Sequence, residues 1–510
     1  MSVAERDERE IQVTESLVDI EQDYLARDFD AALDKVRHFK NSYPAYQLSI
    51  IGCLIDIGSI KQQRSLIEEA ISIYESHSDS DLPDYLYYNA ANGYLSLFHM
   101  TLDEGIGYFE SGKYALKAIE LFGRASQSEP NVLTNYANAL DEIGRPIEAI
   151  KSYDNALRID SNFGMALGNK ALAIRKLAVI SQYQGAYLIY AYQHYKKALE
   201  NEDSIRMYAD DKVITTFKKE MAYIESLFKD EPKRLDVDLT HPALKQKASK
   251  FVKHYTDFCL SNDLYINLHF FSNTTSASIG DTLGVNFVDK KPLKVADDLN
   301  DLAFRLNEIK EAYIGARLSL VQSQYINNDF SNISMQTLII NPLDYSVSSI
   351  YTSYLKMAFK EAFSVLDKIA IFLNHYLELG YDENNRRLSY HSVWYKNLDR
   401  NNDVNEGFDV HDANLFGLYS LLQDIRSSEF DEIRNALTHR YVRLFRSMSV
   451  KDGYDYEDFA GKTIDLMGQI KCAIIYLHNF INTHENSKKS PEDRLITIHF
   501  HTDQWLDIWE

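Results

Sequence analysis

The stretch LTNYANAL (residues 133–140), followed by Gly144 and then AIKSYDNAL (149–157), predicts two helices joined by a short turn. In the second segment, small, aromatic and small residues recur at helical spacing: Ala149, Tyr153 and Ala156. Small side chains let two helices approach closely, and the tyrosine fills the space between one helix pair and the next. The stretch therefore indicates a helical hairpin that stacks on similar neighbours.

The same spacing recurs along the N-terminal half, with a proline closing most copies. The copies are Ala118, Phe122 and Ala125 before Pro130; Ala191, Tyr195 and Ala198; Ala70 and Tyr74 before Pro83; and, more loosely, Ala32 before Pro44. This pattern resembles the tetratricopeptide repeat family over about residues 10–205, although the distance between copies varies. We expect residues 1–205 to form a tetratricopeptide-like array that binds an unidentified protein or ligand on its concave face.

The second half of the chain predicts a further helical domain. A charged, proline-bearing stretch at 206–238 reads as a linker, and residues 239–510 read as a helical bundle with loop insertions. Apolar periodicity predicts helices at about 240–259, 298–324, 348–379, 413–427, 430–446 and 456–483. Long irregular segments are expected at 267–293 and 382–407, and strand-like alternation appears only at 495–500. The expected fold class is all-α.

The composition of the chain argues against several classes of protein. The net charge is −21 and the pI is near 5.2, which argues against a general nucleic-acid coat protein because an acidic surface repels phosphate. The chain has no apolar run long enough to span a bilayer, and its first residues, MSVAERDEREIQV, are charged and lack an apolar core, so no secretory leader is expected. Cys53, Cys259 and Cys472 lie far apart without a metal-ligand pattern. We therefore expect a cytoplasmic protein with no membrane segment, no metal site and no cofactor.

One segment carries residues suited to RNA cleavage, RNALTH at 434–439. A histidine such as His439 can transfer a proton near neutral pH when the ribose 2′-hydroxyl attacks the adjacent phosphate. An arginine such as Arg434 can bond two oxygens of the pentacovalent phosphorane, and Asn435 can orient the phosphate or hold the arginine. The structural alternative is a core role for His439 and an ion pair of Arg434 with Asp431 or Glu432.

A basic cluster follows the motif. Arg440, Arg443 and Arg446 concentrate positive charge locally in an acidic chain, so they are the predicted RNA-binding residues. Tyr441 and Phe445 lie among them, and core packing is the expected role of both rather than base stacking.

The motif and two other segments, NEIKEAY (307–313) and LDKIAIFLNHY (366–376), resemble the HEPN superfamily over about residues 235–485. They are similar to a bacterial subfamily that is also found fused to tetratricopeptide-like repeats. The resemblance implies a metal-independent endoribonuclease that acts as a toxin or antiviral defence effector. It also implies regulation through the repeats and a homodimer, or higher even oligomer, that brings two motifs together. The alternative is a non-catalytic scaffold or dimerisation protein whose HEPN module binds a nucleotide or a protein.

The spacing of the motif is not distinctive by itself. With 22 arginines and 15 histidines in 510 residues, chance gives about 0.6 such pairs, and two rivals exist, at Arg386–His391 and Arg494–His499. We expect both rivals to be fortuitous. The first lies in a polar loop without helical apolar flanks, and the second runs through the strand-like C-terminal segment, beyond the family-like region. Residues five apart on a helix differ by about 140° in direction. The helix must therefore be distorted or end near the motif, or the site must be shared between two copies.

Overall fold

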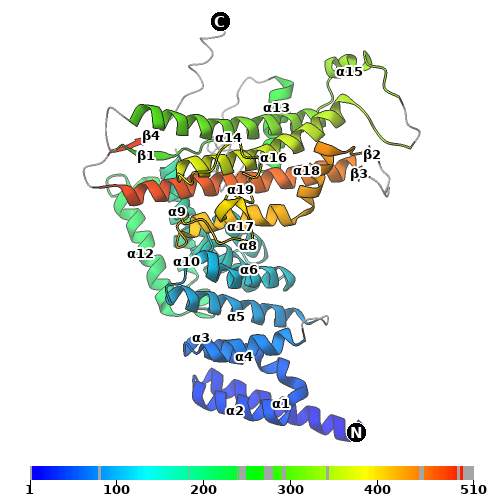
Figure 1. Ribbon diagram of the computed structural model, residues 1–510. Coiled ribbons are helices and arrows are strands. Elements are labelled where there is room, and N and C mark those ends of the chain that lie inside the picture. The colour runs from blue at the N-terminus through cyan, green and yellow to red at the C-terminus, as the bar shows by residue number, and fades with distance from the viewer. Residues whose placement is uncertain are drawn as a thin grey trace. The chain divides into compact units, whose positions relative to one another are not determined.

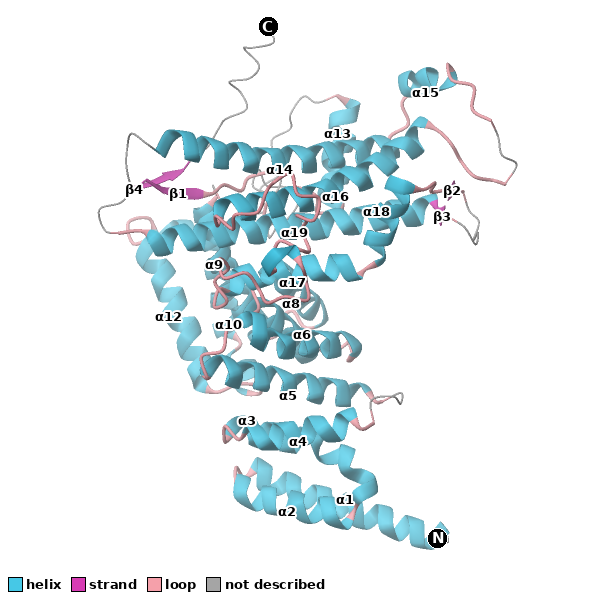
Figure 2. Cartoon of the chain, in the orientation of Figure 1, coloured by secondary structure: helices cyan, strands magenta, loops and turns pink. Residues whose placement is uncertain are grey.

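The structure is a computed structural model that describes residues 3–77, 82–181, 183–237, 239, 249–268, 280–289, 295–340, 344–446, 453–490 and 494–497. The described chain is predominantly helical, as the all-α prediction required (Figures 1 and 2). It divides into two compact units. The repeat unit comprises residues 1–173, 194–219 and 410–416, and the bundle unit comprises 174–193, 220–409 and 417–510.

Antiparallel helices make up the N-terminal part of the chain, with 3₁₀ turns at Pro44–Ile50 and Ala178–Ile180. The helices in order are α1 (Val3–Leu25), α2 (Phe29–Ser42), α3 (Ile51–Ile60), α4 (Arg64–Glu75), α5 (Asp84–Asp103), α6 (Tyr108–Arg124), α7 (Pro130–Glu142), α8 (Pro146–Ile159), α9 (Gly164–Leu177), α10 (Gln184–Glu200), α11 (Glu202–Arg206) and α12 (Asp211–Leu227). Contacts join α1 to α2, α3 to α4, α5 to α6 and α7 to α8. The predicted hairpin array is therefore present.

The small and aromatic positions predicted from the sequence form the core of the array. Ala149, Tyr153 and Ala156 lie in one buried cluster with Leu133 and Ala137 of the preceding helix. The Tyr153 hydroxyl remains satisfied inside this core because it donates a hydrogen bond to Asn138 Oδ1 at 2.7 Å. The matching positions of the other copies are also buried: Ala32, Ala70, Tyr74, Ala118, Phe122, Ala125, Ala191, Tyr195 and Ala198.

The turn between α7 and α8 requires a glycine. Gly144 has a φ of +81°, and a Cβ there would lie 2.0 Å from the carbonyl oxygen of Ala413 in the same unit. We expect Gly144→Ala to lower the free energy of unfolding by about 1–3 kcal/mol, the usual cost of a left-handed non-glycine residue. Gly123→Ala on α6 is the control, because a Cβ there meets nothing within 4 Å. In urea denaturation, we expect only Gly144→Ala to lower the midpoint of unfolding. Equal urea midpoints for the two variants would show that this turn does not require a glycine.

The C-terminal part contains longer helices and a few short strands, with 3₁₀ turns at Pro232–Asp236 and Lys396–Leu398. Its elements are α13 (Lys250–Ser261), β1 (Asn286–Asp289), α14 (Val295–Gln324), α15 (Asn328–Met335), α16 (Ile350–Tyr376), α17 (Ala413–Ser427), α18 (Glu429–His439), β2 (Leu444–Phe445), β3 (Tyr454–Asp455), α19 (Tyr456–Lys488) and β4 (Arg494–Thr497). Helices α14, α16 and α19 pack side by side (Figure 1). Helix α18 lies against α16, β1 pairs with β4, and β2 pairs with β3.

Three segments differ from the sequence-based expectation. The stretch 206–238, expected as a linker, is largely helix α12, because Ile214, Phe217 and Ile224 give it a buried face. The helix expected at 430–446 ends at His439, because Arg440 is extended and Leu444 and Phe445 pair with β3. The irregular segment 267–293 includes β1. Residues 240–248, where a helix start was expected, lie outside the described chain.

Candidate functional site

Helix α18 carries the RNALTH motif. The Ser428 hydroxyl caps its N-terminus by accepting a hydrogen bond from the backbone N–H of Phe430 at 3.2 Å. Phe430 and Ile433 are buried. The Phe430 ring packs edge-on against Phe359 of α16, with ring centroids 6.2 Å apart. These contacts fix the helix so that Arg434 lies in its middle and His439 is its last residue.

Arg434 is held by residues of two helices. Its guanidinium lies 3.7 Å from the carboxylate of Asp367 on α16, and its side chain is 37% exposed. It also donates a hydrogen bond to Asn435 Oδ1 at 3.0 Å, while Asn435 Nδ2 donates to Asp431 at 3.3 Å. The ion pair suggested by the sequence, with Asp431 or Glu432, is therefore replaced by one with Asp367. The guanidinium is positioned and still reaches solvent.

Tyr390 connects the two carboxyl groups around the motif. Its hydroxyl donates to Asp431 Oδ1 and its backbone N–H donates to Asp367 Oδ1, both at 3.3 Å. Burial raises the pKa of Asp367, and nearby Asp431 adds to the increase, while the Tyr390 N–H and Arg434 oppose it. Burial also raises the pKa of Tyr390, and both carboxyl groups reinforce that shift. The site thus contains an acidic pair beside its arginine.

His439 is separate from this network. It is exposed at the C-terminal end of α18, and no hydrogen bond or ion pair joins it to another residue in the described part of the chain. The core role considered for His439 is therefore wrong. Arg434 and His439 lie on one short exposed helix, but no contact joins them.

The basic cluster after the motif is exposed. Arg440, Arg443 and Arg446 all reach solvent, although Arg443 lies 3.5 Å from the carboxylate of Asp344. Tyr441 is fully exposed, so the prediction that it packs in the core is wrong, whereas Phe445 is buried as predicted. Three arginines and an exposed aromatic ring thus follow directly on the motif helix.

The two residues of the rival motif at 386–391 lie in different surroundings. Arg386 is exposed, whereas His391 is half-buried and stacks on Tyr390 with ring centroids 5.3 Å apart. Burial lowers the pKa of His391, Arg400 and Arg434 lower it further, and Asp431 opposes them. His391 lies near the motif helix, because it stacks on Tyr390, whose hydroxyl bonds Asp431; the sequence had favoured a fortuitous match here. In the other rival pair, Arg494 lies in β4 and His499 lies outside the described residues.

Sequence reasoning missed Asp367, Tyr390 and His391 as neighbours of the motif. Asp367 was part of the family-like segment 366–376, which was the only available signal. Tyr390 and His391 lie in a segment expected to be a polar loop, yet that segment contains the fully buried Trp394. The run SYHSVWY at 389–395 is rich in aromatic residues, a composition that could have indicated a packed segment.

Within the described ranges, no group of three or more His, Cys, Asp or Glu side chains is arranged to hold a metal ion. Cys53, Cys259 and Cys472 are free thiols. None of the helices in the described chain is both long and apolar enough to cross a bilayer.

One protein-family model matches part of the bundle unit. Residues 296–484 match the family model described as LA2681-like HEPN, which is less than half of the chain. No curated protein sequence matches. Two crystal structures of MamA overlap 37% and 39% of this chain and 97% and 96% of their own, at 19% and 18% identity, with TM-scores of 0.26 and 0.25. We conclude that residues 296–484, which contain the Arg434 motif, form a HEPN domain of the LA2681-like type.

Proposed function

We propose that this protein is a cytoplasmic, metal-independent endoribonuclease of HEPN type that acts as a toxin or antiviral defence effector and is regulated through its repeat unit. The observation that carries the proposal is the placement of Arg434 and His439 on one exposed helix of the HEPN domain. Arg434 is held in place by Asp367 and Asn435, so little reorganisation is needed when it meets a phosphate.

In the proposed reaction the ribose 2′-oxygen attacks the adjacent phosphorus, and the bond from phosphorus to the 5′-oxygen breaks. Arg434 stabilises the charge on the phosphorane oxygens, and His439 transfers the proton between the 2′-hydroxyl and the leaving 5′-oxygen. Asn435 orients the scissile phosphate. Arg440, Arg443 and Arg446 bind the flanking phosphates of the RNA.

The separation of Arg434 from His439 supports a site shared by two copies. The helix is regular to His439, so the two side chains point about 140° apart. A two-fold dimer can place the histidine of one copy beside the arginine of the other, since such an interface brings the same surface of both copies together.

The acidic surroundings of Arg434 favour a second candidate function. Asp367 partly neutralises the guanidinium, and two successive hydrogen bonds through Asn435 link Arg434 to Asp431. Carboxylates near the motif weaken phosphate binding. A non-catalytic HEPN scaffold, or a module that binds a nucleotide or protein, is the alternative that this observation supports.

The products of RNA cleavage distinguish the endoribonuclease from the non-catalytic scaffold. Purified full-length protein is incubated in EDTA with an RNA oligonucleotide and with a matched oligonucleotide that has a 2′-deoxyribose at the cleaved position. We expect the RNA to yield 2′,3′-cyclic phosphate and 5′-hydroxyl ends and the deoxy analogue to remain intact. Cleavage of the analogue would exclude the mechanism. Intact RNA, with no growth arrest when the protein is expressed, would favour the scaffold.

Asp367 should limit RNA affinity. Asp367→Asn removes a negative charge that lies 3.7 Å from the Arg434 guanidinium. A unit charge at about 4 Å contributes about 1 kcal/mol in water, so we expect RNA to bind the variant about fivefold more tightly. Fluorescence anisotropy with labelled RNA measures this effect. Asp257→Asn, at an exposed position on α13, is the control and should bind like the wild type. Weaker binding by Asp367→Asn would mean that Asp367 chiefly positions Arg434.

A further inference from the structure

The segment that follows the motif helix holds one tyrosine ring entirely in solvent. Tyr441 lies two residues after His439 and is 100% exposed. Tyrosine usually buries part of its ring in a folded protein, so this ring is an uncovered aromatic surface. Arg440 precedes it and Arg443 follows it in the chain, so positive charge lies on both sides of the ring.

The backbone around Tyr441 is fixed by the rest of the bundle unit. Arg440 has extended dihedral angles, with a φ of −140° and a ψ of −170°. The Val442 carbonyl accepts a hydrogen bond from Lys356 Nζ of α16 at 2.6 Å. Val442 is half-buried, whereas Tyr441 and Arg443 are exposed. Such alternation is typical of an extended chain, in which every second side chain points to the same side. Tyr441 and Arg443 are therefore presented to solvent together.

A second exposed ring lies close to Arg443. Tyr345 is 72% exposed and follows Asp344, whose carboxylate lies 3.5 Å from the Arg443 guanidinium. The φ of Tyr345 is +64°, a value that residues other than glycine rarely adopt. An isolated β-bridge between Ser346 and Phe445 holds the next residue in place. Strained backbone of this kind persists where the surrounding structure enforces it, and it is frequent at binding sites.

The surface formed by Tyr345, Tyr441 and Arg443, here called the tyrosine platform, suits unpaired bases better than a duplex. A protein ring reaches the flat face of a base only when that base is unstacked, as in single-stranded RNA. Stacking does not depend on charge, so it can contribute affinity even in a chain of net charge −21. The pair of Arg443 with Asp344 is exposed to solvent and therefore weak, so a phosphate can replace the carboxylate.

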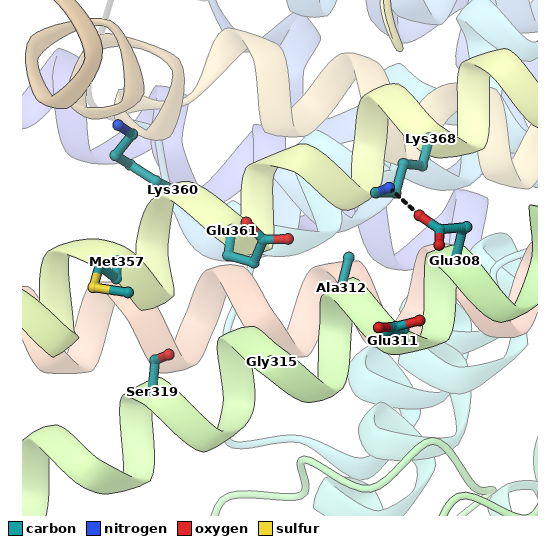
Figure 3. Close-up of a pocket in the computed structure, with 9 residues that line it drawn as sticks. All are labelled: Glu308, Glu311, Ala312, Gly315, Ser319, Met357, Lys360, Glu361 and Lys368. Atoms are coloured by element: carbon teal, nitrogen blue, oxygen red, sulfur yellow. Dashed lines mark hydrogen bonds and ion pairs between the residues drawn. The ribbon is translucent and has the colours of Figure 1, made fainter.

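The groove between α14 and α16 in the same unit suits RNA much less (Figure 3). Its charged lining residues are Glu308, Glu311, Glu361, Lys360 and Lys368. Lys368 is already paired with Glu308 at 2.8 Å, and an excess of carboxylates repels phosphate. Of these two surfaces of the bundle unit, the tyrosine platform is the one whose chemistry matches RNA.

We propose that Tyr441 and Tyr345 each stack on an unpaired base while Arg443 binds a phosphate, so that the protein selects single-stranded RNA over duplex RNA. The inference rests on the proposed function for the identity of the ligand, and it names the class of RNA that the same site takes. Because Tyr441 follows His439 so closely in the chain, the selected nucleotides lie next to the proposed site of cleavage. A protein partner is the competing occupant of the platform.

Binding can be measured without cleavage. The ligand is a labelled, unstructured RNA of mixed sequence with 2′-fluoro sugars, which have no 2′-hydroxyl to attack the phosphate. It is offered to the full-length protein as a single strand, as a duplex with its 2′-fluoro complement, and as a matched oligomer of abasic sugars. The variants are Tyr441→Ala, Tyr345→Ala and the conservative Tyr441→Phe. Tyr85→Ala, at a 55% exposed ring on α5, is the matched control, and thermal melts check that every variant folds.

Fluorescence anisotropy should show that each of the two platform alanine variants binds the single strand about tenfold more weakly, a usual effect of losing one base–aromatic stack. Tyr441→Phe and Tyr85→Ala should bind like the wild type, because both keep the two platform rings. The wild type should bind the duplex and the abasic oligomer at least about tenfold more weakly than the single strand. On the abasic oligomer the alanine variants should match the wild type, because a ring contributes only where a base is present.

Three outcomes would overturn the inference: no binding of the single strand by the wild type, equal affinity for single strand and duplex, or unchanged affinity in either platform alanine variant. Unchanged affinity would point to a protein partner. If binding behaves as expected but unmodified RNA is not cleaved, the proposed endoribonuclease fails and the tyrosine platform stands. If unmodified RNA is cleaved but the platform alanine variants bind normally, the platform fails and the endoribonuclease stands.

Discussion

Replacing Arg434 with alanine is expected to slow RNA cleavage by a factor of about 10²–10³, the usual loss when one preorganised group that stabilises transition-state charge is removed. Arg434→Lys should restore little of the rate, because a lysine ammonium cannot bond two phosphorane oxygens in one plane. Binding of RNA should change much less than the rate, since Arg440, Arg443 and Arg446 remain. Single-turnover cleavage of labelled RNA separates these two effects.

His439→Ala should lower the rate by a factor of about 10²–10⁴, as expected for a lost general acid–base group. The control variants come from the two rival arginine–histidine pairs. They are Arg386→Ala and His391→Ala from the first pair and Arg494→Ala from the second. Because His391 stacks on Tyr390, whose hydroxyl bonds Asp431 of the motif helix, its variant is the most informative control. If His391→Ala abolishes cleavage and His439→Ala does not, the proton-transfer residue has been misassigned.

The second large effect concerns stability of the bundle unit. Arg317 of α14 is 3% exposed and pairs with both oxygens of Asp281 at 2.8 and 2.7 Å. It also donates to the Tyr255 hydroxyl and to the Leu264 carbonyl. Arg317→Ala leaves the Asp281 carboxylate without its partner in a largely buried position. We expect the free energy of unfolding to fall by about 3–5 kcal/mol, as for other broken buried pairs.

Urea denaturation of full-length variants checks this expectation. Removing both charges, with Arg317→Met and Asp281→Leu together, should cost less than Arg317→Ala alone, because no unpaired charge remains. Lys368→Ala breaks a half-exposed pair with Glu308 and should cost under about 1 kcal/mol. Equal decreases in the free energy of unfolding for Arg317→Ala and Lys368→Ala would show that the buried network around Arg317 contributes little to stability.

Local patterns in the sequence predicted the parts of the fold that depend on neighbouring residues. Alanine and tyrosine at helical spacing identified the hairpins, and the same side chains fill the core around Tyr153. Apolar periodicity predicted a helix at 413–427, which is α17. These predictions succeed because burial of one helix face imposes a period that can be read within a single segment.

The sequence alone also singled out Arg434, Asn435 and His439 as candidate site residues, and it predicted a helix that is distorted or ends near the motif, or a site shared between two copies. Only the tertiary structure decided what surrounds them. Asp367 lies far from Arg434 in sequence yet contacts it, and Tyr390 links both carboxyl groups around the motif from another distant segment. Such contacts arise when α16 and α18 pack together, and they leave no period or spacing in the chain.

Tertiary pairing also decided where the motif helix ends. The pattern of 430–446 continues to favour a helix, but Leu444 instead accepts a hydrogen bond from the Val347 N–H, and β2 pairs with β3. His439 thereby becomes the terminal residue of α18. The chemistry of the candidate site is thus determined locally by the sequence, whereas its exposure and its acidic neighbours depend on contacts between segments distant in the chain.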